Sequence, residues 1–454
     1  MMNQPVRTMK IIVFMTVITC ALALTFVSCR KPSVTQLANG TVDSMAKGDF
    51  ASATKNFDNT MKAVMSMKIL RQTWLQLTAQ VGAFKSRIGS RKVKGNGFQI
   101  VYVTCQFEKT TMDIKVVFDK DGNIGGLWFI PIVFAGSVHY SPPAYVHRDR
   151  FVERKVTVGN GEWKLPGTLA IPKGKGPFPA IVLVHGSGPS DRDETIGPNK
   201  PFKDIAWGLA SRGIAVLRYD KRTKVYGRKA IDDNFTVKEE VIDDALAAVE
   251  VLRKSQKIAP DRIFVLGHST GGFLIPRIGN ADQNIAGLIV MAGCTRPIMD
   301  VILGQITYIA SLNQLMTDEA KKEIDNYKQQ IAIVRSLKPS ANSSASSLIM
   351  GVPASYWLDL RSYAPAEMAK SLKQPMLIMQ GERDYQSTTA DFKIWKDALC
   401  SRNDVTLKLY PDLNHLFITG IGKATPEDYD KPGSLAQTVI EDITSWIGAQ
   451  VKNN

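Results

Sequence analysis

The chain has 454 residues, of which 44% are hydrophobic and 22% charged, and its formal net charge is +15. This composition is typical of a globular protein and excludes a disordered chain, a collagen and a protein with many membrane spans, while the length allows two or three domains. The positive charge is concentrated in residues 1–150, but no basic cluster there accompanies a recognisable nucleic-acid module, so we expect no nucleic-acid partner.

An export signal is predicted at residues 1–28. Arg7 and Lys10 precede an uncharged apolar run, and Cys29 follows the signal directly. The segment resembles the lipobox of bacterial lipoproteins, although Phe26 stands where leucine is usual. We therefore expect an exported protein that is tethered to the membrane through a lipidated Cys29 and faces the periplasm. A secreted protein without the lipid and an uncleaved membrane anchor are the alternatives.

Residues 29–140 are predicted to form a small α+β domain. Apolar residues recur with a helical period from Ser33 to about Arg91. From Gly97 they alternate, which predicts antiparallel strands at 99–107, 112–118 and 124–130. Helices followed by such strands are typical of an α+β domain. The layout resembles the cystatin-like or NTF2-like domains of unknown function that precede secreted hydrolases, and we find no candidate catalytic set in it.

A linker at 141–150 leads into residues 151–454, where strand-like and helix-like runs alternate. Helices are predicted at 202–211, at 238–253 and around Ile394, and the apolar strands between them are predicted at 151–158, 164–171, 180–184, 214–217, 263–266, 288–291, 376–379 and 405–409. Apolar strands that alternate with helices indicate an α/β domain, with a mostly parallel sheet covered on both faces.

The alternation of strands and helices is interrupted at residues 295–372. This insertion contains a soft Ser-rich stretch at 341–347 and an amphipathic helix whose apolar positions are Ile324, Tyr327, Ile331 and Val334. A long insertion before a late strand is typical of a lid over a site. A helical decoration without a role at the site is the alternative.

The cysteines outside the signal and position 29 are Cys105, Cys294 and Cys400. Three thiols so far apart in sequence predict neither a disulfide framework nor a zinc site. We interpret each of them as a small buried hydrophobic residue.

The segment Gly267-His268-Ser269-Thr270-Gly271 matches the pattern G-x-S-x-G, and it directly follows a predicted strand and opens a helical stretch. This is the context in which the pattern holds a serine on a sharp turn at the carboxyl edge of a sheet. Glycines flank the serine because larger side chains would collide in so tight a turn. Ser269 is therefore the candidate nucleophile.

A serine hydroxyl needs a base and a carboxylate that orients the base. Of the five histidines, only His415 follows a late strand, so it is the candidate base. Asp384 directly follows the strand at 376–379 and gives the order Ser, Asp, His that this fold requires. Glu382 is the alternative carboxylate, whereas Asp412 is too close to His415 in sequence to reach it easily.

The developing negative charge on an attacked carbonyl oxygen needs fixed hydrogen-bond donors. The glycine-rich segment His185-Gly186-Ser187-Gly188 follows the strand at 180–184, where such a loop belongs. The predicted donors are the backbone N–H groups of Ser187 and of Thr270. A plain glycine turn is the alternative for this loop. Asp191, Arg192 and Asp193 are interpreted first as an ion-paired structural turn and second as substrate contacts.

These residues together resemble the α/β-hydrolase family, and more narrowly the bacterial secreted esterase-like serine hydrolases. The resemblance covers about residues 148–454 and is carried by the segments 185–194, 219–222, 267–272, 381–384 and 414–417. It implies carboxylic ester hydrolysis, with Ser269, Asp384 and His415 in the triad positions. Two departures are Thr223, where glycine usually follows Tyr-Asp-Lys-Arg, and Thr270, where glutamate is common. Both departures leave the triad residues in place, but the substrate preference of the family cannot be transferred to this chain.

We therefore expect a serine esterase that acts on a small-molecule ester through an acyl-enzyme and needs no metal or organic cofactor. A serine peptidase, a thioesterase and an acyltransferase on the same fold are alternatives, and so is a non-catalytic binding protein of the cell envelope. Peptidases of the prolyl-oligopeptidase kind usually carry a propeller, for which residues 33–150 are too few. No pattern in the sequence indicates the oligomeric state.

Overall fold

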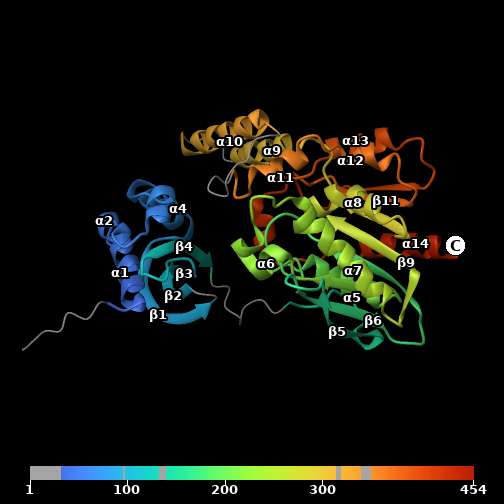
Figure 1. Cartoon of the computed structure of the whole chain (residues 1–454), viewed down its shortest axis with the longest axis horizontal. Coiled ribbons are helices and arrows are strands. Elements are labelled where there is room, and N and C mark those ends of the chain that lie inside the picture. Colours follow the sequence, from blue (N-terminus) through green and yellow to red (C-terminus); the bar gives the residue numbers. More distant parts are fainter. Residues whose placement is uncertain (1–31, 96–97, 132–139, 313–317, 339–348, 454) are drawn as a thin grey trace, which may run out of the picture. The chain divides into compact units, whose positions relative to one another are not determined.

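The computed structural model describes residues 32–95, 98–131, 140–312, 318–338 and 349–453 (Figure 1). The chain divides between residues 137 and 138 into two compact units. The predicted export signal and Cys29 lie outside the described residues. Within the described part of the chain, no helix has both the length and the apolar character that a membrane span requires.

The described residues of the first unit form four helices followed by a four-stranded antiparallel sheet in the order β1-β2-β3-β4. Helix α1 begins after Ser33, whose hydroxyl accepts the N–H of Gln36 at 3.2 Å while the Gln36 side chain accepts the N–H of Ser33 at 2.8 Å. This capping box satisfies two backbone donors that the first helical turn leaves unpaired. The elements are α1 (Val34–Ala46), α2 (Phe50–Thr54), α3 (Asn59–Val64), α4 (Met67–Val81), β1 (Phe84–Gly95), β2 (Phe98–Phe107), β3 (Thr111–Phe118) and β4 (Ile124–Pro131).

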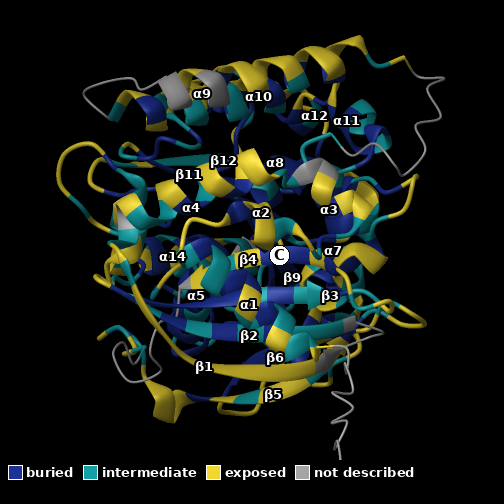
Figure 2. Cartoon of the chain, turned by 90° about the vertical axis from the view of Figure 1, so that its left-hand side faces the viewer, coloured by how far each residue is buried: buried dark blue, intermediate teal, exposed yellow. Residues whose placement is uncertain are grey.

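The prediction of helix up to Arg91 is wrong, because α4 ends at Val81 and β1 follows it. Strand β1 lies at the edge of its sheet and is exposed from residue 85 to residue 93 (Figure 2). Even its apolar residues Ile88 and Val93 are exposed. An edge strand with no buried face shows no apolar alternation in its sequence, and charged residues at such an edge oppose pairing with other chains.

In the second unit, the residues that the structure describes form an eight-stranded sheet in the order β12-β11-β10-β9-β7-β8-β6-β5. Strands β7 to β12 run parallel, whereas β5 and β6 are antiparallel additions at one edge. In the centre, Ile289 lies opposite Leu266 on one side and Leu377 on the other. The mostly parallel sheet is therefore confirmed. Its strands are β5 (Phe151–Val158), β6 (Leu165–Pro172), β7 (Phe178–Val184), β8 (Ala215–Tyr219), β9 (Ile258–His268), β10 (Gly287–Met291), β11 (Met376–Gly381) and β12 (Val405–Tyr410).

Helices cover both faces of this sheet and bury two hydrophobic cores. One core includes Phe202 and Trp446, from helices on one face, and the other includes Phe273 and Trp395, from helices on the opposite face. The predicted helix 238–253 begins with a π-helical turn, Lys238–Ile242, before it becomes regular. The covering helices are α5 (Pro201–Ala210), α7 (Asp243–Arg253), α8 (Thr270–Ala281), α13 (Thr389–Ala398) and α14 (Gln437–Asn453), and a short α6 (Arg222–Tyr226) follows β8.

The insertion between β10 and β11 is helical, and its helices α9, α10 and α11 lie together (Figure 1). In α10, the predicted apolar positions Ile324, Ile331 and Val334 are buried and Tyr327 is half-buried. The Ser-rich stretch 341–347 lies outside the described residues. The helices are α9 (Ile298–Leu312), α10 (Asp318–Ser336), α11 (Ala354–Leu360) and α12 (Pro365–Ala369).

The three cysteines do not share one environment. Cys105 and Cys294 are buried, as expected, and burial raises the pKa of the Cys105 thiol to about 12. Cys400 is exposed, so the expectation of a buried residue is wrong there. It lies in the turn after α13, where the pattern of apolar residues ends.

Candidate active site

The predicted site residues follow four strands of the parallel part of the sheet. Ser187 follows β7, Ser269 follows β9, Asp384 follows β11 and His415 follows β12. Because these strands are parallel, their carboxyl ends lie along one edge of the sheet. The topology therefore brings these four segments, which are spread over residues 187 to 415 of the sequence, to the same edge.

Ser269 occupies a strained turn between β9 and α8. Its backbone φ and ψ are 54° and −117°, in a region that non-glycine residues rarely adopt. Its N–H donates to Met291 O at 2.9 Å and its carbonyl accepts the N–H of Phe273 at 2.9 Å. A Cβ at Gly267 would lie 2.3 Å from the carbonyl of Gly271, so the turn closes only with glycine there. This is the steric requirement that the sequence pattern predicts.

Asp384 and His415 form a buried pair. Asp384 Oδ2 lies 2.7 Å from His415 Nδ1, and both side chains are at least 95% buried. The other oxygen, Oδ1, accepts the backbone N–H groups of Gln386 and Ser387 at 2.7 and 3.0 Å. Gln380 Nε2 donates to Oδ2 at 3.0 Å. Three donors besides the imidazole thus fix the carboxylate. It contacts the imidazole through Nδ1, which leaves Nε2 outside this contact.

Glu382 and Asp412, the other carboxylates near His415 in sequence, are exposed. Neither contacts His415 among the described residues. Arg383, between Glu382 and Asp384, forms an ion pair with Asp428 at 3.0 Å.

His268 connects the segments of Ser269 and His415. Its ring lies 4.8 Å from the His415 ring between centroids, and its Nε2 donates to the carbonyl of His415 at 2.9 Å. Among the described residues, Ser269 Oγ forms no hydrogen bond.

The two predicted oxyanion donors are available at this edge. Within the described residues, the N–H groups of Ser187 and Thr270 have no hydrogen-bond partner, and Ser187 is exposed. Thr270 is the first residue of α8, so its N–H lies at the positive end of the helix dipole. A Cβ at Gly186 would lie 3.6 Å from Ser269 Oγ, which places this loop beside the serine.

Comparisons with known proteins agree with this architecture. Residues 177–419 match the family model described as serine aminopeptidase S33, and residues 38–127 match a domain family of unknown function. Esterase EstD from Thermotoga maritima is 40% identical over 406 residues, which are 89% of this chain and 93% of that relative. The chain belongs to the serine aminopeptidase S33 family.

Solved structures also match this chain, at low sequence identity. Est1E from Butyrivibrio proteoclasticus is 16% identical over 66% of this chain and 99% of its own, with a TM-score of 0.42. An esterase from Pyrococcus furiosus is 16% identical over 67% of this chain and 91% of its own, with a TM-score of 0.41. The family match and the sheet topology confirm the predicted α/β-hydrolase fold with a small domain of unknown function before it.

A buried Glu–His pair lies next to the predicted triad of this S33-family chain. Glu194 Oε2 lies 3.0 Å from His268 Nδ1, although no hydrogen bond of good geometry joins these two atoms among the described residues. Burial alone would raise the pKa of Glu194, but the charge of His268 holds that pKa below its usual range. Burial alone would lower the pKa of His268, but Glu194 raises it. The contact between the two side chains therefore favours the protonated form of His268 and the ionised form of Glu194.

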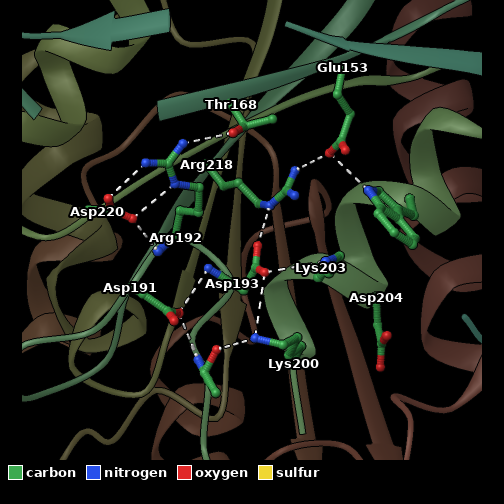
Figure 3. A network of polar contacts seen from close by, with 12 residues as sticks. Glu153, Thr168, Asp191, Arg192, Asp193, Lys200, Lys203, Asp204, Arg218 and Asp220 are labelled. Atoms are coloured by element: carbon green, nitrogen blue, oxygen red, sulfur yellow. Dashed lines mark hydrogen bonds and ion pairs between the residues drawn. The ribbon is translucent and has the colours of Figure 1, made fainter. Parts of the chain in front are cut away.

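The segment that carries Glu194 is held by ion pairs (Figure 3). Arg192 forms a two-pronged pair with Asp220, with contacts of 2.9 and 2.8 Å. Arg218, which is buried, bridges Asp193 at 2.9 Å and Glu153 at 2.8 Å. These contacts support the interpretation of Arg192 and Asp193 as parts of an ion-paired structural turn. Of the described residues, no three His, Cys, Asp or Glu side chains group as metal ligands.

His185 should make this S33-family protein sensitive to acid. Its ring is buried against Phe202 and Tyr219, with centroids 5.0 and 5.4 Å away. Burial lowers the pKa of His185 from 6.5 to about 4. Between these values the unfolded chain binds a proton that the folded chain does not bind, so stability falls as the pH falls through this window.

The variant His185→Gln should lose less stability in acid than the wild type. The difference in the free energy of unfolding between pH 7 and pH 4 should shrink by about 3 kcal/mol, because the titrating group is gone. Urea denaturation at several pH values measures this difference. Curves with the same pH dependence for both proteins would show that the buried imidazole does not control acid stability.

Proposed function

We propose that the protein hydrolyses carboxylic esters, with Ser269 as nucleophile, His415 as base and Asp384 as the carboxylate that orients the base. The observation that carries this proposal is the 2.7 Å contact between Asp384 and His415 at the sheet edge where Ser269 stands on its strained turn. The relative EstD, which is 40% identical over most of both chains, is an esterase. Ester hydrolysis is therefore the activity that site and relative support together.

In the proposed mechanism, the Ser269 hydroxyl attacks the ester carbonyl carbon while His415 Nε2 takes its proton. The imidazolium is stabilised by the fixed carboxylate of Asp384. It then returns the proton to the alkoxide oxygen, and the alcohol leaves. Water, deprotonated by the same imidazole, attacks the acyl-enzyme, and the imidazolium then gives this proton to Ser269 Oγ as the bond from that oxygen to the acyl group breaks and the acid leaves. The proton and the acyl group are thus accounted for in both acylation and deacylation, and neither step uses a metal or an organic cofactor.

The N–H groups of Ser187 and Thr270 are proposed to bind the carbonyl oxygen as it becomes negative. They belong to two segments, the loop after β7 and the first turn of α8. Fixed donors act more strongly on the oxyanion than on the neutral carbonyl. The relative position of these two segments therefore determines the rate of the acylation step.

Peptide hydrolysis is the second candidate, because the matching family is described as a serine aminopeptidase family. The same triad could attack an amide, but an aminopeptidase must also hold a free α-amino group. Comparing kcat/KM for p-nitrophenyl esters with that for aminoacyl p-nitroanilides separates the two activities. We expect the esters to be preferred.

Covalent labelling tests the nucleophile directly. A fluorophosphonate probe should react once per chain, and the modified peptide should contain Ser269. The Ser269→Ala variant should bind no probe, while it retains its circular dichroism spectrum. Ser187→Ala is the matched control, because it alters a hydroxyl in the neighbouring loop and leaves the backbone donor in place. A probe adduct on any residue other than Ser269 would refute the assignment.

A further inference from the structure

Lys221 is a buried lysine for which the proposed mechanism has no role. Its Nζ lies 2.8 Å from Glu240 Oε1 and donates to the carbonyl oxygen of Gly186 at 2.9 Å. Lys221 is 2% exposed and Glu240 is 7% exposed. Burying two charges costs free energy that their attraction often only offsets, so this pair is weak evidence for stability alone. Its position beside Gly186 indicates a role at the site.

The carbonyl that Lys221 holds belongs to the same peptide group as the N–H of Ser187. A peptide group is planar, and in this trans peptide the oxygen and the hydrogen point in opposite directions. An ammonium fixed on the oxygen therefore fixes the direction of the Ser187 N–H. It also polarises the peptide, which makes that N–H a stronger donor.

The peptide group before Gly186 is held by a charge of the opposite sign. The N–H of Gly186 donates to Glu194 Oε1 at 2.8 Å. Gly186 is thus fixed at its nitrogen by a buried carboxylate and at its oxygen by a buried ammonium. The next backbone donor, the N–H of Ser187, has no partner among the described residues.

The ion pair is also connected to the helices inserted between β10 and β11. Tyr356 of α11 donates its hydroxyl to Glu240 Oε2 at 2.8 Å, and its ring stacks on Phe235. Burial, together with the charge of Glu240, holds the pKa of Tyr356 well above its usual value, so the hydroxyl remains a donor. Glu240 lies in the π-helical turn Lys238–Ile242, a rare conformation that is frequent at functional sites.

We propose that the Lys221–Glu240 ion pair, held by Tyr356, is a positioning device that aims the Ser187 N–H at the developing oxyanion. This inference rests on the proposed function and names positioning residues for it. The neighbouring pair Arg222–Asp244 provides a comparison. It is also buried, with a contact of 2.6 Å, and it forms no contact with Gly186.

The test replaces both members of each ion pair, so that no unpaired charge is left in the interior. In Lys221→Met/Glu240→Gln, kcat for a p-nitrophenyl ester should fall about 10- to 100-fold with KM nearly unchanged, because the loss of one oxyanion donor costs about 100-fold or more. The matched control Arg222→Met/Asp244→Asn should retain kcat within about twofold. Melting temperatures of both variants show whether they lose stability equally.

A transition-state analogue separates positioning from stability. A trifluoromethyl ketone forms a tetrahedral adduct with a serine hydroxyl, and its inhibition constant should weaken by the same factor as kcat/KM in Lys221→Met/Glu240→Gln. The single variant Tyr356→Phe keeps the stacked ring. Like Lys221→Met/Glu240→Gln it should lower kcat, but only by about two- to fivefold.

The inference is overturned if Lys221→Met/Glu240→Gln matches the Arg222/Asp244 control in kcat and in affinity for the ketone. An unchanged kcat in Tyr356→Phe overturns the role of the tyrosine. Fluorophosphonate labelling of the wild type distinguishes this failure from failure of the proposed function. If Ser269 is labelled and the two ion-pair variants have the same kcat and the same affinity for the ketone, only the positioning role is wrong. If Ser269 is not labelled, the proposed function is wrong as well.

Discussion

Replacing Asp384 by Asn is expected to lower kcat for ester hydrolysis by about 10⁴-fold while the fold is retained. The two backbone N–H groups on Oδ1 require an acceptor, so the amide oxygen of the new Asn must take that position. Its NH₂ group then faces His415 Nδ1, which has to accept instead of donate. The proton moves to Nε2, and the imidazole can no longer deprotonate Ser269.

Steady-state kinetics with a p-nitrophenyl ester measure this loss, and a melting curve checks the fold. Glu382→Gln is the matched control, because Glu382 lies two residues away, is exposed and is the alternative carboxylate. It should retain kcat within about twofold. A loss of activity in Glu382→Gln and a mild effect in Asp384→Asn would show that Glu382, and not Asp384, orients His415.

The fold of the second unit is predictable because its central strands are buried on both faces. Ala180–Val184 and Met376–Met379 are continuous apolar runs, and every residue in both is buried. The order of motifs after such strands then places Ser269, Asp384 and His415 at one edge. Strand β1 of the first unit is the opposite case, since an exposed edge strand has no buried face to leave a pattern.

The buried charges around the site could not be predicted in the same way. Lys221 contacts Gly186, 35 residues earlier, and Glu240 lies on a turn that has no sequence signature. Glu194 and His268 lie in segments whose recognisable features are glycines and a serine, and no pattern in these segments predicts a contact between the two residues. Only the folded chain shows that opposite charges hold the loop after β7. A pair of buried charges whose residues are distant in sequence leaves no periodicity.

Replacing Gly271 by Ala is expected to damage both the fold and the site. A Cβ at this position would lie 2.3 Å from Val184 O and 2.7 Å from His185 O, which are backbone atoms that cannot rotate away. Helix α8 must therefore shift from the end of β7. Overpacking of this kind costs about 1–3 kcal/mol, which urea denaturation measures. The same shift separates the N–H of Thr270 from that of Ser187, so kcat should fall by about 100-fold, since a displacement near 1 Å has this effect.

Gly448→Ala is the matched control for this substitution. Gly448 lies within α14, and a Cβ there meets no atom within 4 Å. Alanine favours the helix over glycine, so this variant should gain about 0.5–1 kcal/mol of stability and retain its kcat. If Gly271→Ala were as stable and active as Gly448→Ala, the contact between α8 and the end of β7 would not be the constraint that holds the two oxyanion donors together. If only the stability fell, the two N–H groups would not both be needed for turnover.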